Sequence, residues 1–271
     1  MQPHHGVHGS PGVPASRRIR YLVRVRHHRL AVAPLAVLVV FSGSLVAAPA
    51  LAAWDDCEPI DHSGEWEYRH ERAESARTEA QLRALFENPT VIEAAAVSTD
   101  QRGASIDTLT QTHAVFPVDA VSMLRTLRSN DILTSFMPNL GDHEVVCRLS
   151  DHVERQRQRT DFGLLIFTLG TEYVIDVEYV DLGPDVYSSR WVLVESLDGR
   201  MSYLYGSWYF ESITLDGAPA TYVRHYARTG LTTRVPGVRG FIDRRLEGQV
   251  MGLFAAFYEE AARRFGRTVL N

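Results

Sequence analysis

The sequence predicts an α+β fold in which one curved antiparallel sheet packs against a single long C-terminal helix. Residues 142–230 are almost wholly strand-like, and the turn signals Gly183-Pro184, Asp198-Gly199 and Asp216-Gly217 divide them into long hairpin strands. Over residues 238–265 apolar positions recur every three or four residues, which predicts one long amphipathic helix. Because the sheet must bury its apolar face on that helix, we expect the pair to enclose a cavity.

The segments before residue 142 are shorter and more mixed. A highly charged stretch with a weak helical pattern, which ends before Pro89, reads as an appendage. The segments after it are two extended stretches around a turn (91–97 and 104–115), a helix with Pro and Asp in its first turn (117–127), and a short helix ended by Pro138 (130–136). We therefore expect a signal segment (1–53), a partly helical N-terminal extension (54–103) and a ligand-binding domain (104–271).

The first 53 residues predict a cleaved secretory signal. They hold six arginines and no acidic residue, followed by the charge-free apolar run Leu30–Ala53, in which Ala50-Leu51-Ala52 fits a cleavage site. A retained membrane anchor is the alternative, because the run is about long enough to span a bilayer. Pro34 and Pro49 divide the run and favour cleavage. We therefore expect a periplasmic or extracellular protein.

The composition excludes several kinds of chemistry. None of the 28 basic residues is a lysine, so a Schiff base or a phosphate-loop lysine is ruled out. Two cysteines and scattered histidines predict no metal site and no cofactor. Residues 54–271 carry 22 arginines against 33 acidic residues, a net charge of −11, so we expect no nucleic-acid partner. A transient membrane or envelope partner stays open, as does the oligomeric state.

The two cysteines suggest a disulfide. In an oxidising compartment Cys57 and Cys147 could pair and tie the N-terminal extension to the rest of the protein. The chain-entropy model gives about 4 to 5 kcal/mol for a loop of about 90 residues. The alternative is one buried thiol and one exposed thiol.

Several short motifs share their order and spacing with a known superfamily. They are Ala114–Val121 at a strand-to-helix start, Phe136–Leu140, Asp161-Phe162-Gly163, Trp191, Gly206-Ser207-Trp208, Ala220–Val223 and Val235-Pro236-Gly237 before the last helix. On these motifs, residues 104–266 resemble the START-like, Bet v 1-like superfamily, also called SRPBCC or the polyketide cyclase/dehydrase and lipid transport family. The resemblance implies the helix-grip fold and a hydrophobic ligand between sheet and helix, such as a lipid, sterol, quinone or polyketide. Only some branches of that superfamily are enzymes.

Aromatic residues are dense on the strands and on the inward stripe of the last helix. Aromatic rings suit an apolar ligand, because each offers a large rigid contact area. The candidates to line the cavity are Tyr173, Tyr179, Trp191, Glu195, Trp208, Tyr226, Phe254 and Phe257. The alternative for the rings is that they simply fill a core.

Glu195 is the ionisable candidate. If its strand alternates strictly, Glu195 shares a face with Trp191 and Leu193 and lies among apolar groups, where it needs a polar partner. That position would suit a residue that orients a ligand hydroxyl or acts as an acid or base. If Val192 and Val194 point inward instead, Glu195 lies in water.

One strand has no apolar face, because polar residues occupy both sides. They are Arg155, Arg157 and Arg159 on one side and Glu154, Gln156 and Gln158 on the other. We expect this strand to lie exposed at an edge of the sheet, where charge discourages pairing with other sheets. Alternatively, one polar row faces a wet cavity and meets a ligand carboxylate or phosphate.

These observations favour an exported protein that binds or carries a hydrophobic small molecule between sheet and helix. Transfer of apolar ligand surface from water would drive binding, at about 25 cal/mol per Å². We expect a binding protein rather than an enzyme, and assign no catalytic residue. A cyclase or dehydratase that uses Glu195 or a neighbouring histidine is one alternative, and an envelope structural module with a filled core is another.

Overall fold

The computed structural model describes residues 57–62, 77–100, 103–164, 167–233 and 238–267. All of them belong to one compact unit, Val46–Asn271. The predicted signal segment, residues 1–53, lies outside the described residues.

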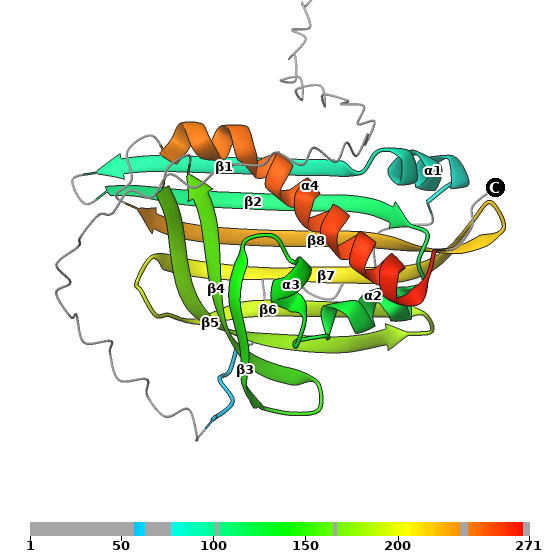
Figure 1. The fold of residues 1–271 in the computed structure, drawn as a ribbon, viewed down its shortest axis with the longest axis horizontal. Coiled ribbons are helices and arrows are strands. Elements are labelled where there is room, and N and C mark those ends of the chain that lie inside the picture. The colour runs from blue at the N-terminus through cyan, green and yellow to red at the C-terminus, as the bar shows by residue number, and fades with distance from the viewer. Residues whose placement is uncertain (1–56, 63–76, 101–102, 165–166, 234–237, 268–271) are drawn as a thin grey trace, which may run out of the picture. The chain divides into compact units, whose positions relative to one another are not determined.

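In the part of the chain that the structure describes, eight antiparallel strands form one sheet, in the order β1-β2-β8-β7-β6-β5-β4-β3 (Figure 1). They are β1 (Thr90–Asp100), β2 (Gly103–Phe116), β3 (Leu140–Arg148), β4 (Val153–Leu164), β5 (Phe167–Gly183), β6 (Val186–Ser196), β7 (Met201–Leu215) and β8 (Ala218–Thr233). The chain forms β1 and β2 at one edge, crosses to the other edge at β3, and returns strand by strand until β8 pairs with β2. Gly199 and Gly217 in the hairpin turns have positive φ (66° and 74°), a conformation that favours glycine.

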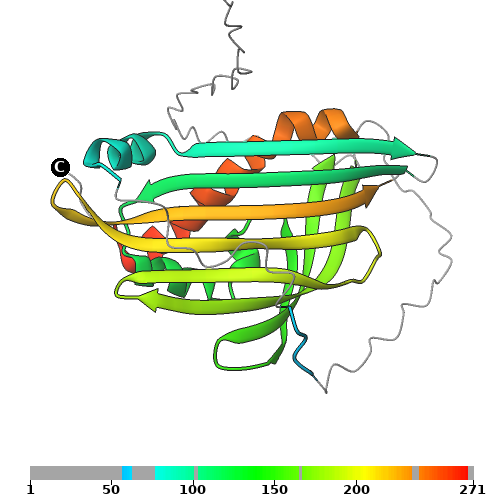
Figure 2. The ribbon, with the colours of Figure 1, turned by 180° about the vertical axis from the view of Figure 1, so that it is seen from behind.

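Within the described residues, four helices accompany the sheet: α1 (Glu79–Glu87), α2 (Ala120–Leu127), α3 (Leu133–Phe136) and α4 (Val238–Phe265). Figure 1 shows α4 crossing the same face of the sheet as α2 and α3, and Figure 2 shows the strands from behind. Thr78 starts α1 with a capping box to Gln81, and Asp119 starts α2 by accepting a hydrogen bond from the Ser122 backbone N–H. None of the helices in the described ranges is both long and apolar enough to cross a membrane.

Each face of the sheet has its own core, because neighbouring residues of a strand point to opposite faces. Trp208 packs with Phe257 of α4 on one face, which we call the α4 face. Tyr209 and Tyr222 pack with Leu82 of α1 on the other, which we call the α1 face. A residue's position along its strand therefore decides which of the two cores it joins.

This architecture confirms the predicted α+β fold, with a curved antiparallel sheet and one long C-terminal helix. Helix α4 spans the range predicted from its periodicity. Strand β1 pairs with β2 along its whole length, so the predicted extension (54–103) contains α1 and an edge strand of the sheet. Strand β4 is not an edge strand, because β3 pairs with it, and the prediction that it lies exposed at the edge is wrong.

Candidate ligand-binding site

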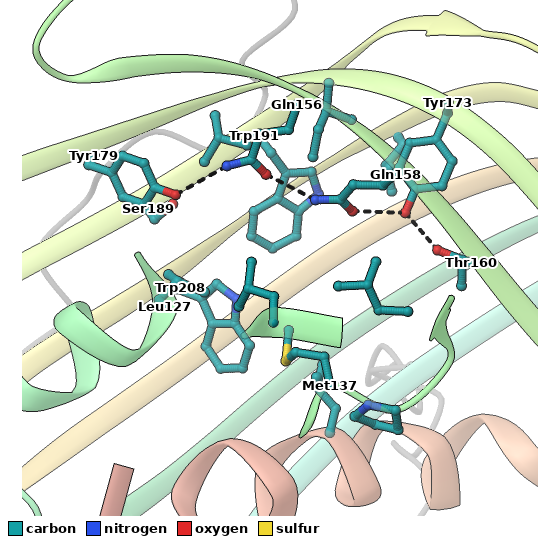
Figure 3. Close-up of a pocket in the computed structure, with 17 residues that line it drawn as sticks. Leu127, Met137, Gln156, Gln158, Thr160, Tyr173, Tyr179, Ser189, Trp191 and Trp208 are labelled. Atoms are coloured by element: carbon teal, nitrogen blue, oxygen red, sulfur yellow. Dashed lines mark hydrogen bonds between the residues drawn. The ribbon is translucent and has the colours of Figure 1, made fainter. Parts of the chain in front are cut away.

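A cavity of about 230 Å³ lies between the α4 face of the sheet and the helices that cover it. Most of its 17 lining residues are apolar (Figure 3). The apolar side chains other than the aromatic ones are Leu127, Leu133, Met137, Pro138, Leu140, Ile175, Val177, Leu204 and Leu253. Because an engineered apolar cavity of about 150 Å³ binds benzene, this one is large enough for a small organic molecule.

Two tryptophans form rigid walls of the cavity. Trp191 of β6 pairs with Gly206 of β7, where a Cβ would clash with the indole, so the missing side chain lets the ring lie over the sheet. The ring stacks on His225 of β8, with 5.6 Å between ring centroids. Trp208 packs against Phe254 of α4, at 5.2 Å between centroids. Both indoles are thus held from behind and present fixed apolar surfaces.

One wall carries a row of hydrogen-bonding side chains, which we call the polar row: Gln156, Gln158 and Thr160 of β4 and Tyr173 and Tyr179 of β5 (Figure 3). Tyr173 Oη lies 2.8 Å from Thr160 Oγ1 and donates to Gln158 Oε1 at 3.2 Å. Gln158 Nε2 donates to Gln156 Oε1 at 3.0 Å, and Gln156 Nε2 donates to Tyr179 Oη at 3.4 Å. The hydrogen bonds therefore run in one direction, from Thr160 to Tyr179.

The polar row is uncharged at neutral pH. Burial raises the pKa of the Tyr179 phenol, and the nearby Glu154 carboxylate acts in the same direction. Burial likewise raises the pKa of Tyr173. Neither phenol can serve as a base near pH 7, and the described lining residues include no Asp, Glu, Arg or His.

Half of the predicted candidates line the cavity, namely Tyr173, Tyr179, Trp191 and Trp208. Phe254 and Phe257 are fully buried behind Trp208 and support it, which is the core-filling alternative. Tyr226 lies on the α1 face beside Tyr205, with 6.4 Å between ring centroids. Its neighbour His225 is the residue that points to the α4 face, so the prediction that Tyr226 lines the cavity is wrong.

Glu195 is exposed and does not line the cavity. The strand alternation breaks just before it, because Leu193 pairs with Ile175 whereas Glu195 pairs with the adjacent Val174. Strand β6 therefore carries an extra residue at a β-bulge, which turns Glu195 to the side opposite Leu193. The prediction that places Glu195 among apolar groups is wrong, and the acid or base role that depended on it is lost.

The β4 half of the polar row was not among the residues predicted to line the cavity. The available signal was the alternation of Gln156 and Gln158 with arginines, which was interpreted mainly as an exposed edge. The alternative, a polar row facing a cavity, matches the structure, although amides and not arginines face inward. Arg155 points to the α1 face.

His225 is a buried polar group next to the cavity wall. Its ring lies 4.3 Å from that of Trp208 and meets Phe254 edge-on, between ring centroids 5.9 Å apart. Its Nδ1 has no hydrogen-bond partner among the described residues. Burial lowers its pKa to about 3, so the imidazole is neutral at physiological pH.

On the α1 face, residues 57–62 are attached to the sheet at two points. Cys57 forms a disulfide with Cys147 of β3. Asp176 of β5 accepts hydrogen bonds from Arg155 Nε (2.7 Å), Arg155 Nη2 (2.9 Å) and His62 Nε2 (2.9 Å). All three of these ionisable side chains are buried, so their mutual contacts replace the water they have lost.

A sheet that holds a long C-terminal helix over a cavity defines the helix-grip class of folds. No family model matches this sequence, and no curated protein matches it. Solved structures do match. Human StAR-related lipid transfer protein 5 aligns with a TM-score of 0.50 at 12% identity, over 63% of this chain and 87% of its own.

Two further structures align less closely. The STAR-related lipid transfer protein of Xanthomonas axonopodis has a TM-score of 0.45 at 12% identity, over 62% of this chain and 98% of its own. The Zhui aromatase/cyclase from Streptomyces sp. R1128 has a TM-score of 0.42 at 13% identity, over 58% and 95%. The protein thus has the START-like, Bet v 1-like fold that its sequence motifs predicted.

Proposed function

We propose that the protein is an exported carrier that binds a hydrophobic small molecule in the cavity between its sheet and α4. The single observation that carries this proposal is the cavity itself, with apolar walls and two tryptophans fixed from behind. Removing apolar ligand surface from water supplies the driving force, and the polar row fixes the ligand's orientation.

The composition of the cavity favours binding over catalysis. The titratable groups among its described lining residues are the phenols of Tyr173 and Tyr179, whose pKa values burial raises. Glu195, the proposed acid or base of an enzyme, is exposed elsewhere on β6. A solid core, as expected for a purely structural module, would leave no space of this volume.

We also propose that the protein is exported, because its N-terminal sequence has the features of a secretory signal. A disulfide between Cys57 and Cys147 is consistent with an oxidising compartment. Cell fractionation together with mass determination of the mature N-terminus tests this point. Retention of residues 1–53 in a cytoplasmic protein would contradict it.

A pair of matched substitutions tests carriage directly. Leu204 lines the cavity, whereas Leu231 is a partly buried leucine that packs on the same core outside it. Leu204→Phe fills the cavity and should weaken binding of apolar probes at least tenfold, whereas Leu231→Phe should leave binding unchanged. Fluorescence titration measures both, and native mass spectrometry with lipid extraction of protein from its own envelope identifies the natural ligand. No recovered ligand, together with no thermal shift across a panel of lipids and quinones, would refute the proposal.

A further inference from the structure

The volume and walls of the cavity limit the size and shape of the part of a ligand that it encloses. A cavity of about 150 Å³ that binds benzene provides about 25 Å³ for each carbon atom, so the 230 Å³ here accommodates roughly nine non-hydrogen atoms. Trp191 is held over Gly206, and Trp208 is held by Phe254, so neither wall can readily adapt to a flexible chain. Rigid indole surfaces favour a flat ring in stacked or edge contact.

The walls also oppose a charged ligand. A carboxylate or an ammonium group would lose its water here and meet no opposite charge among the described lining residues. The Glu154 carboxylate does not line the cavity, and it accepts hydrogen bonds from Asn130 Nδ2 at 2.8 Å and from Gln156 Nε2 at 3.4 Å. The Arg128 guanidinium lies 4.8 Å from the centroid of the Tyr179 ring but does not line the cavity, so the polar row offers hydrogen bonds without a counter-ion inside the cavity.

Two hydroxyl groups at one end of the polar row have hydrogens to donate. Tyr179 Oη accepts from Gln156 Nε2, and no described residue accepts its phenolic hydrogen. Ser189 pairs with Tyr179 across β5 and β6, lines the cavity with 1% of its surface exposed, and makes no side-chain hydrogen bond within the described ranges. Figure 3 shows the two side by side. Because both hydroxyls line the cavity with a hydrogen to donate, a ligand oxygen that accepts from them would be favoured.

From these observations we infer that the cavity selects an uncharged aromatic carbonyl compound. Its ring lies against Trp191 and Trp208, and its carbonyl oxygen accepts hydrogen bonds from Tyr179 and Ser189. This inference rests on the proposed function, because it names the class of molecule that the same cavity takes.

Three probes of equal size test the inference: acetophenone, its alkene isostere α-methylstyrene, and benzoate. Acetophenone should bind roughly 5- to 100-fold more tightly than α-methylstyrene, which is the effect of two net hydrogen bonds. Benzoate should bind more weakly than either. Titration followed by protein NMR measures all three affinities on the intact chain.

Substitutions test whether Tyr179 and Ser189 are the hydrogen-bond donors to the ligand. Tyr179→Phe combined with Ser189→Ala should abolish the preference for the ketone and leave the affinity for α-methylstyrene unchanged. Tyr187→Phe is the matched control, because this tyrosine packs against the same core from β6 but does not line the cavity. If the double variant does not fold, Ser189→Ala alone and the three-probe comparison on the native protein decide the question.

The outcomes separate this inference from the proposed function. Equal binding of the ketone and the alkene, or tightest binding of benzoate, would overturn the inference and leave a carrier of apolar molecules intact. A ketone preference that persists without both hydroxyls would overturn the assignment of the donors. Failure of all three probes to bind, with no ligand recovered from the native protein, would remove the proposed function itself.

Discussion

Gly206 of β7 lies beneath the Trp191 indole, and the backbone carbonyl oxygen of Tyr226 is equally close to the point where a Cβ would stand. A side chain at this position would meet both groups, and the carbonyl belongs to the sheet ladder and cannot move aside. The absence of one methyl group thus determines where a wall of the cavity lies. Trp191 needs this space because it extends over β7 to reach His225 on β8.

Gly206→Ala should lower the free energy of unfolding by about 1 to 3 kcal/mol, because the added methyl overpacks the site. It should also weaken probe binding, since Trp191 must tilt into the cavity. Denaturant unfolding and fluorescence titration measure the two effects. Gly248→Ala on α4 is the control: a Cβ there meets nothing within 4 Å, and alanine should stabilise the helix by up to about 1 kcal/mol. A Gly206→Ala protein as stable as the native one would contradict this account of Trp191.

His225 should make stability depend on pH. Its pKa is about 3 in the folded protein because of burial, against about 6.5 when unfolded, so below pH 6.5 the unfolded chain binds the extra proton. Stability contributed by the neutral imidazole is complete above pH 6.5 and is lost as the pH falls toward 3, by at most about 1.4 kcal/mol per pH unit. His113 acts in the same direction, because burial and the charges of Arg77 and Arg224 lower its pKa to about 4.

Urea unfolding from pH 7 to pH 4 measures this dependence. His225→Phe should reduce the slope of stability against pH to the part that His113 and the acidic residues contribute. His152→Gln replaces an exposed histidine and should leave the slope unchanged. A His225→Phe protein with the native slope would mean that the imidazole is not buried in its neutral form.

Strand geometry explains why Tyr226 and Glu195 lie elsewhere than predicted. Alternation along a strand predicts which residues share a face, and it correctly grouped Tyr173 with Tyr179. It cannot reveal which of two apolar faces looks toward the cavity, and Tyr226 was assigned to the wrong one. Alternation also cannot reveal a β-bulge. The extra residue before Glu195 is visible only in the pairing of β6 with β5, and the local sequence gives no sign of it.

Strand β4 shows how one element serves both faces of a sheet. Its amides point into the cavity, while Arg155 points to the α1 face and pairs with Asp176 of β5. A strand with two polar faces normally lies at the edge of a sheet. Strand β4 lies inside the sheet, because β3 pairs with its outer side. Its buried charges find partners in residues 57–62, where a backbone carbonyl accepts from Arg155 and His62 contacts Asp176. Those partners lie far away in sequence, so no local pattern could have predicted them.

Asp176→Asn should lower the free energy of unfolding by about 3 to 5 kcal/mol, because it leaves the buried Arg155 guanidinium without its counter-charge. The double variant Arg155→Met with Asp176→Leu should lose less, since it buries no unpaired charge. Chemical unfolding curves of both variants measure the difference. A loss below about 1 kcal/mol for Asp176→Asn would indicate that the cluster admits water.

At the scale of the whole molecule, the long-range periodicities were sufficient to predict the architecture. The change from a period of two to a period of three or four at residue 238 located α4, and the turn glycines separated the strands. These periodicities could not predict the strand order, in which β8 returns to pair with β2. That pairing joins strands far apart in sequence, so no local pattern specifies it.

The disulfide and the Asp176 cluster attach residues 57–62 to the α1 face, opposite the cavity, so this attachment should affect stability without affecting binding. Replacing both Cys57 and Cys147 by Ser should lower the free energy of unfolding by about 4 to 5 kcal/mol, because the lost crosslink spans 90 residues and no longer restricts the unfolded chain. Probe affinity should stay at the native value.

Urea unfolding and probe titration of the native protein, with and without a reductant, provide the control in which no side chain changes. Equal stability of the oxidised and reduced forms would mean that the Asp176 cluster alone holds the segment, and a loss of affinity on reduction would mean that the two faces of the sheet are coupled.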